Sequence, residues 1–237
     1  MKDRSRHHGK PAYPTRISFV TDRLRRSHLS AQKIVDVGFI GEYERAEVHY
    51  AIVDNLASAD SLVGIDVDEK KMNRFLSNPR TKLLQGQKNL EYRVMSVFET
   101  GFKDDTFDFV LLLEVLEHLR SPYLVFNEIY RILKPGGSVI ITYPNPLEIG
   151  KLMRYIFQKD LLNVKYLDNF RGMSEHKVFP HPVCLAIYLN DIGFRVDAVE
   201  FIKCGFRCLD YLFQVLRLLF RLENKFSSYV GVAATKK

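Results

Sequence analysis

The stretch that most constrains the fold of this chain is residues 107–146. It opens on FDFVLLL, an apolar run that is too short for an ordinary helix and typical of a strand buried on both faces of a parallel sheet. A Ser-Pro pair at 121–122 predicts the capped start of a helix, KPGG predicts its end, and SVIITY predicts a second strand. Such a right-handed βαβ unit binds ligands beyond the carboxyl ends of its strands. Glu114, Glu117 and His118 lie at that end.

The rest of the chain alternates between helical and strand patterns, which favours an α/β protein. Further strands are expected over residues 33–37, 61–66, 91–97, 195–203 and 228–235, the last pairing antiparallel with its predecessor. Further helices are expected over residues 16–31, 42–56, 68–78 and 182–190. In the second of these, His49 falls on the apolar stripe, which favours a core histidine over a catalytic one.

A chain of 237 residues with 46% hydrophobic content can build one sizeable α/β core. We expect a flexible basic arm over residues 1–16 and a single domain over 17–237, with a helical lid inserted at 147–170. Of the net charge of +7, residues 1–16 carry +4 and 203–237 carry +5, which leaves −2 for the middle. The basic balance therefore comes from the ends and does not indicate that the core domain binds nucleic acid.

The composition also bears on the compartment. No apolar run is long enough to span a membrane, the first residues lack the apolar core of a signal peptide, and the three cysteines form no C-x-x-C pair. We therefore expect a cytoplasmic protein. The apolar stretch 206–222, with its spaced arginines, predicts a helix that either packs on the sheet or lies in a membrane interface, so peripheral membrane association stays open.

Two short patterns point to a nucleotide-type ligand. The first strand ends in Asp36-Val37-Gly38 and is followed by Gly41, and a glycine turn between a strand and a helix lets backbone N–H groups approach a ligand. The second strand ends in Asp66, whose carboxylate can accept hydrogen bonds from both hydroxyls of a ribose.

Together with the stretch 107–146 and the segment GIDVDE at 64–69, this order resembles the class I S-adenosylmethionine-dependent methyltransferases of the small-molecule and glycan type. The segment SEH at 174–176, the aromatic Phe179 and the helix ending LNDIGF are also similar to that branch. The resemblance implies a Rossmann-like doubly wound sheet, mostly parallel with an antiparallel last strand and helices on both faces. It also implies S-adenosylmethionine as the cofactor and a small-molecule or glycan-like acceptor.

The resemblance also assigns expected roles to single residues. Asp36, Gly38 and Gly41 would hold the amino-acid part of the cofactor, and Asp66 its ribose. Val67, Ser96 and the backbone N–H of Val97 would border the adenine, and Glu114 would face the methionine moiety or the sulfonium. Two positions depart from the family pattern: Ile40 stands where the second glycine of the turn is usual, and Ser96 stands where an aspartate is usual.

Transfer to a hydroxyl acceptor requires a base, and the candidates are His118, Glu117 and His176. A structural role at the helix entry is an equal alternative for His118. His181, beside a proline, favours a structural role.

Other functions remain open at this stage. The basic ends suggest an RNA methyltransferase, although the D/N-P-P-aromatic signature of amino-methylating enzymes is missing after the fourth strand. The departures at Ile40 and Ser96 allow a non-catalytic binding protein on the same fold. A nicotinamide dehydrogenase would require a full G-x-G-x-x-G turn, and no cluster of acids and histidines has metal-ligand spacing.

Overall fold

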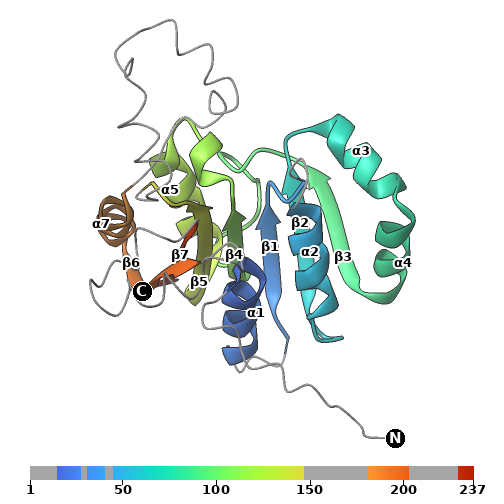
Figure 1. Cartoon of the computed structure of the whole chain (residues 1–237), viewed down its shortest axis with the longest axis horizontal. Helices are drawn as coiled ribbons and strands as arrows, with labels where there is room; N and C mark the ends of the chain where they lie inside the picture. The colour runs from blue at the N-terminus through green and yellow to red at the C-terminus, as the bar shows by residue number, and fades with distance from the viewer. Residues whose placement is uncertain (1–14, 28–30, 41–44, 147–180, 203–228) are drawn as a thin grey trace, which may run out of the picture.

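The computed structural model describes residues 15–27, 31–40, 45–146, 181–202 and 229–237. These residues form a seven-stranded sheet in the order β3-β2-β1-β4-β5-β7-β6 (Figure 1). The strands are β1 (Lys33–Val37), β2 (Ser61–Asp66), β3 (Asn89–Val94), β4 (Phe107–Leu113), β5 (Leu133–Pro144), β6 (Phe194–Ile202) and β7 (Tyr229–Lys236). The first five are parallel, whereas β7 runs antiparallel to both β5 and β6. The expected mostly parallel, doubly wound sheet with an antiparallel last strand is confirmed.

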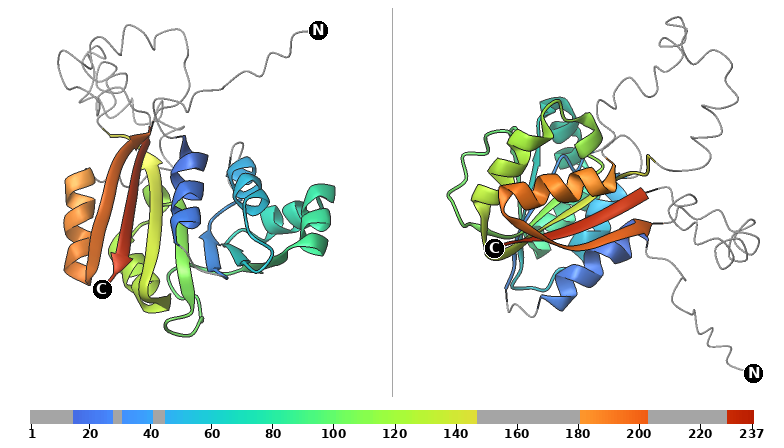
Figure 2. Two further views of the ribbon diagram at one scale, coloured as in Figure 1. Left: turned by 90° about the horizontal axis from the view of Figure 1, so that it is seen from below. Right: turned by 90° about the vertical axis from the view of Figure 1, so that its left-hand side faces the viewer.

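Helices cover both faces of this sheet (Figure 2). They are α1 (Arg16–Arg26), α2 (Arg45–Asp54), α3 (Glu69–Ser77), α4 (Pro79–Gln87), α5 (Pro122–Ile132) and α7 (Pro182–Ile192), with a short 3₁₀ turn, η1 (Leu116–His118). The buried side chains form two clusters, one containing residues of α5 and α7 and the other residues of α1 to α4. Among the described residues, no helix is long and apolar enough to cross a membrane.

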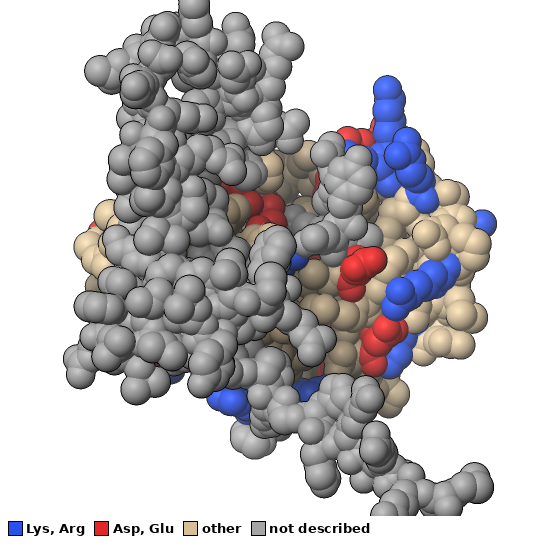
Figure 3. Space-filling model, viewed as in Figure 1, with Lys and Arg blue, Asp and Glu red and all other residues tan. Residues whose placement is uncertain are grey.

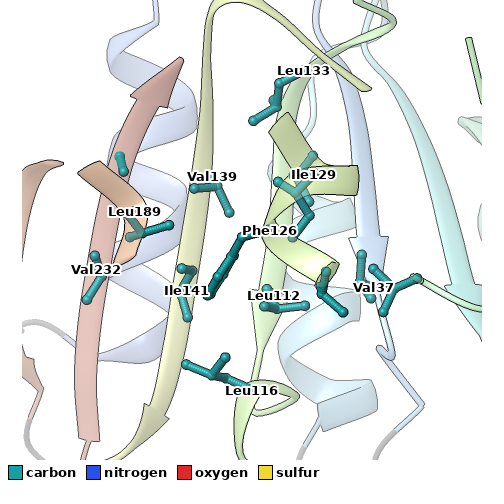
Figure 4. Close-up of a cluster of buried hydrophobic side chains, with 14 of the residues drawn as sticks. Val37, Leu112, Leu116, Phe126, Ile129, Leu133, Val139, Ile141, Leu189 and Val232 are labelled. Carbon is teal, nitrogen blue, oxygen red and sulfur yellow. The ribbon is translucent and has the colours of Figure 1, made fainter. Parts of the chain in front are cut away.

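Strand β4 is the centre of both clusters. All seven of its residues are buried, and successive side chains alternate between the clusters, with Val110 and Leu112 on the α5 side and Phe109 and Leu111 on the α1 side. Figure 4 shows Leu112 beside Phe126 of α5. This two-sided burial is the reason that the strand is a continuous apolar run in the sequence.

The described structure differs from the expected elements at several places. Strand β5 was expected from residue 138 but begins at Leu133, so the KPGG segment lies within it. Strand β3 was expected over 91–97 but lies two or three residues earlier, so Ser96 and Val97 follow it. After the helix expected over 68–78, a further helix that was not expected, α4, begins at Pro79, and Asn78 caps it by accepting a hydrogen bond from the N–H of Arg80. Ser121 was expected to cap α5, yet its side chain makes no capping hydrogen bond.

The arm over residues 1–14, the lid over 147–170 and the helix over 206–222 lie outside the described residues, as do Gly41 and His176. Arg16, the last residue of the expected arm, is the first residue of α1.

Candidate functional site

Three neighbouring strands bring predicted site residues to one edge of the sheet. β1 lies between β2 and β4, with Val37 aligned to Ile65 on one side and to Leu112 on the other. Gly38, Asp66 and Glu114 therefore stand at or just beyond the carboxyl ends of adjacent parallel strands, the upper ends of the arrows in Figure 1. The strand order reverses between β1 and β4, and a doubly wound sheet binds its ligand at such a point. Acidic side chains are visible there in the space-filling view (Figure 3).

The turn after β1 is built on Gly38 and on the two large residues that follow it. Gly38 has φ 57°, a conformation that favours glycine, and its N–H donates to the carbonyl of Ile65 at 2.7 Å. Phe39 is fully buried, with its ring 4.4 Å from that of His49. Ile40, which replaces the usual glycine, donates its N–H to Asp66 Oδ2 at 3.3 Å. The altered turn is therefore held by the burial of Phe39 and by the hydrogen bond from Ile40 to Asp66 of β2.

Asp66 is held in place by backbone donors. Its Oδ1 accepts from the N–H of Asp68 at 3.0 Å, and its Oδ2 accepts from Ile40. The side chain remains half-buried, and each carboxylate oxygen has a second lone pair for a ligand hydroxyl. An oriented carboxylate at this edge fits the two hydroxyls of a ribose.

The residues expected around an adenine follow β2 and β3 at the same edge. Val67 is 68% exposed, directly after β2. The N–H of Met95 donates to the carbonyl of Asp66 at 2.9 Å, which places the segment after β3 beside β2. Ser96 accepts a hydrogen bond from the N–H of Phe98 through its hydroxyl, and Val97 is buried. Val67 thus offers exposed apolar surface at this position, and Ser96 closes a local turn.

Asp36 lies beneath the glycine turn. It is 1% exposed, and its Oδ2 is 2.8 Å from Nδ1 of His49, which is equally buried. His49 is therefore a core histidine, as its place on the apolar stripe predicts. Within the described part of the chain, Oδ1 of Asp36 is buried without a hydrogen-bond partner.

Glu114 occupies a strained position at the end of β4. Its φ of 56° lies in the left-handed region, which non-glycine residues adopt mainly at functional sites and turns. The hydroxyl of Thr142 donates to Glu114 Oε1 at 2.9 Å, and Oε2 lies 3.9 Å from a guanidinium nitrogen of Arg16. The Arg16 guanidinium also stacks over the ring of Tyr229, 4.4 Å from its centroid.

The two polar residues of η1 have opposite exposures. Glu117 is 2% exposed, whereas His118 is exposed at the edge of the sheet. The sequence patterns grouped the two as alternative bases. They did not predict the 3₁₀ turn that buries Glu117 and leaves His118 exposed. His118 is consequently the one of this pair that an acceptor can reach.

Thr142 and Arg16 were missed as site residues. Thr142 carries the one aliphatic hydroxyl in the run VIITY, and the register pairs it with Leu113, the residue before Glu114. A polar residue in a central strand was the available signal. Arg16 was not singled out, because its contact with Glu114 depends on the tertiary fold.

A hollow of about 810 Å³ lies between α7 and β6, with Val183, Ile187, Val199 and Phe201 among its lining residues. β6 is separated from β1 by β4, β5 and β7, so this hollow is distinct from the edge that carries Gly38 and Asp66. Among the described residues, no group of three or more side chains is placed to hold a metal ion.

Comparison with known proteins gives a consistent result. Residues 49–141 match the family model described as a methyltransferase domain. A ubiquinone biosynthesis O-methyltransferase of Pseudomonas savastanoi is 27% identical, in a match that covers 78% of this chain and 73% of that protein. The mitochondrial ubiquinone biosynthesis O-methyltransferase of Rattus norvegicus is 26% identical over 78% of this chain, but the match spans only 52% of the rat protein.

The fold has solved counterparts. A crystal structure of an S-adenosylmethionine-dependent methyltransferase from Mesorhizobium loti superposes with a TM-score of 0.59 and 16% identity, covering 93% of this chain and 98% of that one. At that identity the likeness concerns the fold.

Proposed function

We propose that the chain is a class I S-adenosylmethionine-dependent methyltransferase that transfers the methyl group to a hydroxyl oxygen of a small molecule. The observation that carries the proposal is the meeting of the Gly38 turn, Asp66 and Glu114 beyond three adjacent strands. The relatives in ubiquinone biosynthesis, which methylate oxygen by name, favour a hydroxyl acceptor.

The described residues fit the cofactor. The Gly38 turn allows close approach of backbone, Asp66 presents an oriented carboxylate for the ribose, and Val67 offers apolar surface for the adenine. Glu114 brings a carboxylate to the edge where a sulfonium would lie, and opposite charges attract strongly in a partly buried site. When bound, S-adenosylmethionine supplies a methyl group on a good leaving group.

The protein then has to align the acceptor and remove its proton. Alignment alone can supply a large part of a methyl-transfer rate, because it replaces a bimolecular encounter. We assign the proton to His118, which is exposed four residues after Glu114, because histidine is the commonest general base in enzymes. His176 stays the second candidate.

Binding of the cofactor is the first test. Isothermal titration should detect binding of S-adenosylmethionine and of S-adenosylhomocysteine. If neither compound binds, the proposal is rejected. Methyl transfer from isotopically labelled S-adenosylmethionine can then be measured by mass spectrometry with three acceptor classes: hydroxylated intermediates of ubiquinone biosynthesis, a glycan and RNA. An O-methylated small molecule is expected. A methylated glycan would change the proposed acceptor from a small molecule to a glycan. Methylated RNA would contradict the proposal of a small-molecule acceptor.

The role of His118 can be separated from binding. His118→Asn should lower the transfer rate by about 100-fold or more, the usual size of a general-base contribution, and leave the affinity for S-adenosylhomocysteine unchanged. The matched control is His181→Asn, since His181 caps α7 and asparagine caps equally well. An unchanged rate for His118→Asn would shift the base to His176.

We also propose a cytoplasmic enzyme with peripheral membrane contact through residues 206–222, which would suit a membrane-partitioned acceptor. Sedimentation of the full chain with anionic vesicles is the expected result, and recovery in the supernatant would reject this contact.

A further inference from the structure

A buried chain of three polar side chains runs beneath the glycine turn. Oδ2 of Asp36 is 2.8 Å from Nδ1 of His49, and Nε2 of His49 is 3.1 Å from the hydroxyl of Tyr92. The three residues come from β1, α2 and β3. Buried polar groups with this degree of connection fix one arrangement, because losing any member leaves another without a partner.

The direction of the hydrogen bonds follows from the chemistry of the groups. Burial, and next the charge of Asp36, raise the pKa of Tyr92 well above its ordinary value of 10, so its hydroxyl stays protonated and can donate to Nε2 of His49. His49 then carries its proton on Nδ1 and donates to the Asp36 carboxylate.

Aromatic rings fix the position of His49. Its ring centroid lies 4.4 Å from that of Phe39, 5.7 Å from Phe75 and 6.2 Å from Tyr50. Tyr92 approaches closely because residue 64 is glycine: a Cβ at that position would lie 2.7 Å from the ring of Tyr92. The packing therefore leaves His49 and Tyr92 a single arrangement toward Asp36.

One oxygen of Asp36 is left over. His49 takes Oδ2, whereas Oδ1 is buried and has no hydrogen-bond partner within the described part of the chain. An unsatisfied carboxylate oxygen in a buried position is costly, and a cationic ligand that pairs with it recovers the loss. Asp36 lies two residues before Gly38, where the ligand approaches the backbone.

We propose that His49 and Tyr92 are positioning residues for the cofactor, which hold Asp36 so that its second carboxylate oxygen receives the ammonium group of the cofactor's amino-acid end. This inference rests on the proposed cofactor site and extends it to two residues that do not touch the ligand. Removing the Tyr92 hydroxyl should make His49 less firmly held, and through it Asp36. The protein should then lose affinity only for ligands that carry the ammonium group.

The test compares two ligands and two matched tyrosine variants. S-adenosylhomocysteine carries the amino-acid end, whereas 5′-methylthioadenosine keeps the adenosine and sulfur without it. Tyr92→Phe should weaken S-adenosylhomocysteine by about three- to tenfold, the equivalent of one hydrogen bond, and leave 5′-methylthioadenosine unchanged. Tyr50→Phe is the control. Tyr50 belongs to the same group of aromatic rings, but its hydroxyl bonds to Thr81, so this variant should alter neither affinity.

A second variant guards against misfolding. His49→Gln keeps an amide donor for Asp36 and should fall between wild type and His49→Phe in its affinity for S-adenosylhomocysteine, with folding checked by circular dichroism. Equal weakening of both ligands by Tyr92→Phe would overturn the inference in favour of a purely structural role, and so would no weakening at all. If the wild-type protein bound neither ligand, the cofactor site itself would be rejected instead.

Discussion

The hydroxyl of Thr142, on β5, donates to Oε1 of Glu114 at 2.9 Å, while the N–H of Glu114 donates to the carbonyl of Thr142 at 2.8 Å. The two residues thus exchange hydrogen bonds at the point where β4 ends. This double contact holds Glu114 in its left-handed conformation and aims its carboxylate at the edge of the sheet.

Thr142→Val removes the hydroxyl and keeps the shape of the side chain. We expect it to weaken S-adenosylmethionine binding by about three- to tenfold, because the carboxylate of Glu114 loses one of the groups that hold it. Isothermal titration measures the change. Thr142→Ser keeps the hydroxyl and should bind like wild type. Equal affinities for the valine and serine variants would show that Glu114 does not need the Thr142 hydroxyl.

Asp66 and Asp68 form a matched pair of neighbouring acids. Asp66→Asn should weaken S-adenosylhomocysteine at least about tenfold, because an amide offers one acceptor oxygen where two ribose hydroxyls need a carboxylate. Asp68 instead caps α3 by accepting from the N–H of Lys71 at 2.9 Å. Asparagine caps as well as aspartate, so Asp68→Asn should bind normally. Similar losses of affinity in both variants would indicate damage to the β2–α3 connection. That result would contradict the proposed role of Asp66 in binding the ribose.

The sequence patterns predicted those parts of the site that depend on strand ends. Gly38, Asp66 and Glu114 all follow apolar runs, and parallel strands bring their carboxyl ends together, so their meeting could be inferred without a structure. His49 was also assigned correctly to the core, because its helix has a periodic apolar stripe.

The patterns failed where the outcome depends on tertiary contacts. Nothing local to Tyr92 reveals that its hydroxyl meets His49, which is 43 positions away. Glu117 and His118 are adjacent in sequence, and only the turn at η1 decides that one is buried and the other exposed. The end of β3 was also misjudged, because EYRVMSV continues to alternate after the strand has finished at Val94.

The acid stability of the fold should depend on Glu128. This residue accepts from Thr100 and Arg131, and the Arg131 hydrogen bond is the main reason that the pKa of Glu128 falls from 4.5 to about 2. A lowered pKa in the folded state adds stability that is present above pH 4.5 and is lost as the pH falls toward 2.

Glu128→Gln should therefore lower the free energy of unfolding by about 1 kcal/mol at pH 7, and the difference from wild type should shrink between pH 4.5 and 2. Urea denaturation at several pH values measures it. Glu91→Gln is the control, because its ion pair with Arg93 is exposed and should contribute little. A difference for Glu128→Gln that stays constant down to pH 2 would contradict the argument.

A substitution at Gly231 tests how closely α1 packs on the sheet, and a substitution at Gly86 of α4 is the control. A Cβ at Gly231 of β7 would lie 2.6 Å from the buried ring of Phe19, whereas a Cβ at Gly86 of α4 would meet nothing within 4 Å. Gly231→Ala should therefore cost about 1–3 kcal/mol of stability through overpacking. Gly86→Ala should raise stability by about 0.5–1 kcal/mol, because alanine favours a helix. Urea denaturation compares the two, and a neutral Gly231→Ala would mean that α1 can move away from β7 without loss.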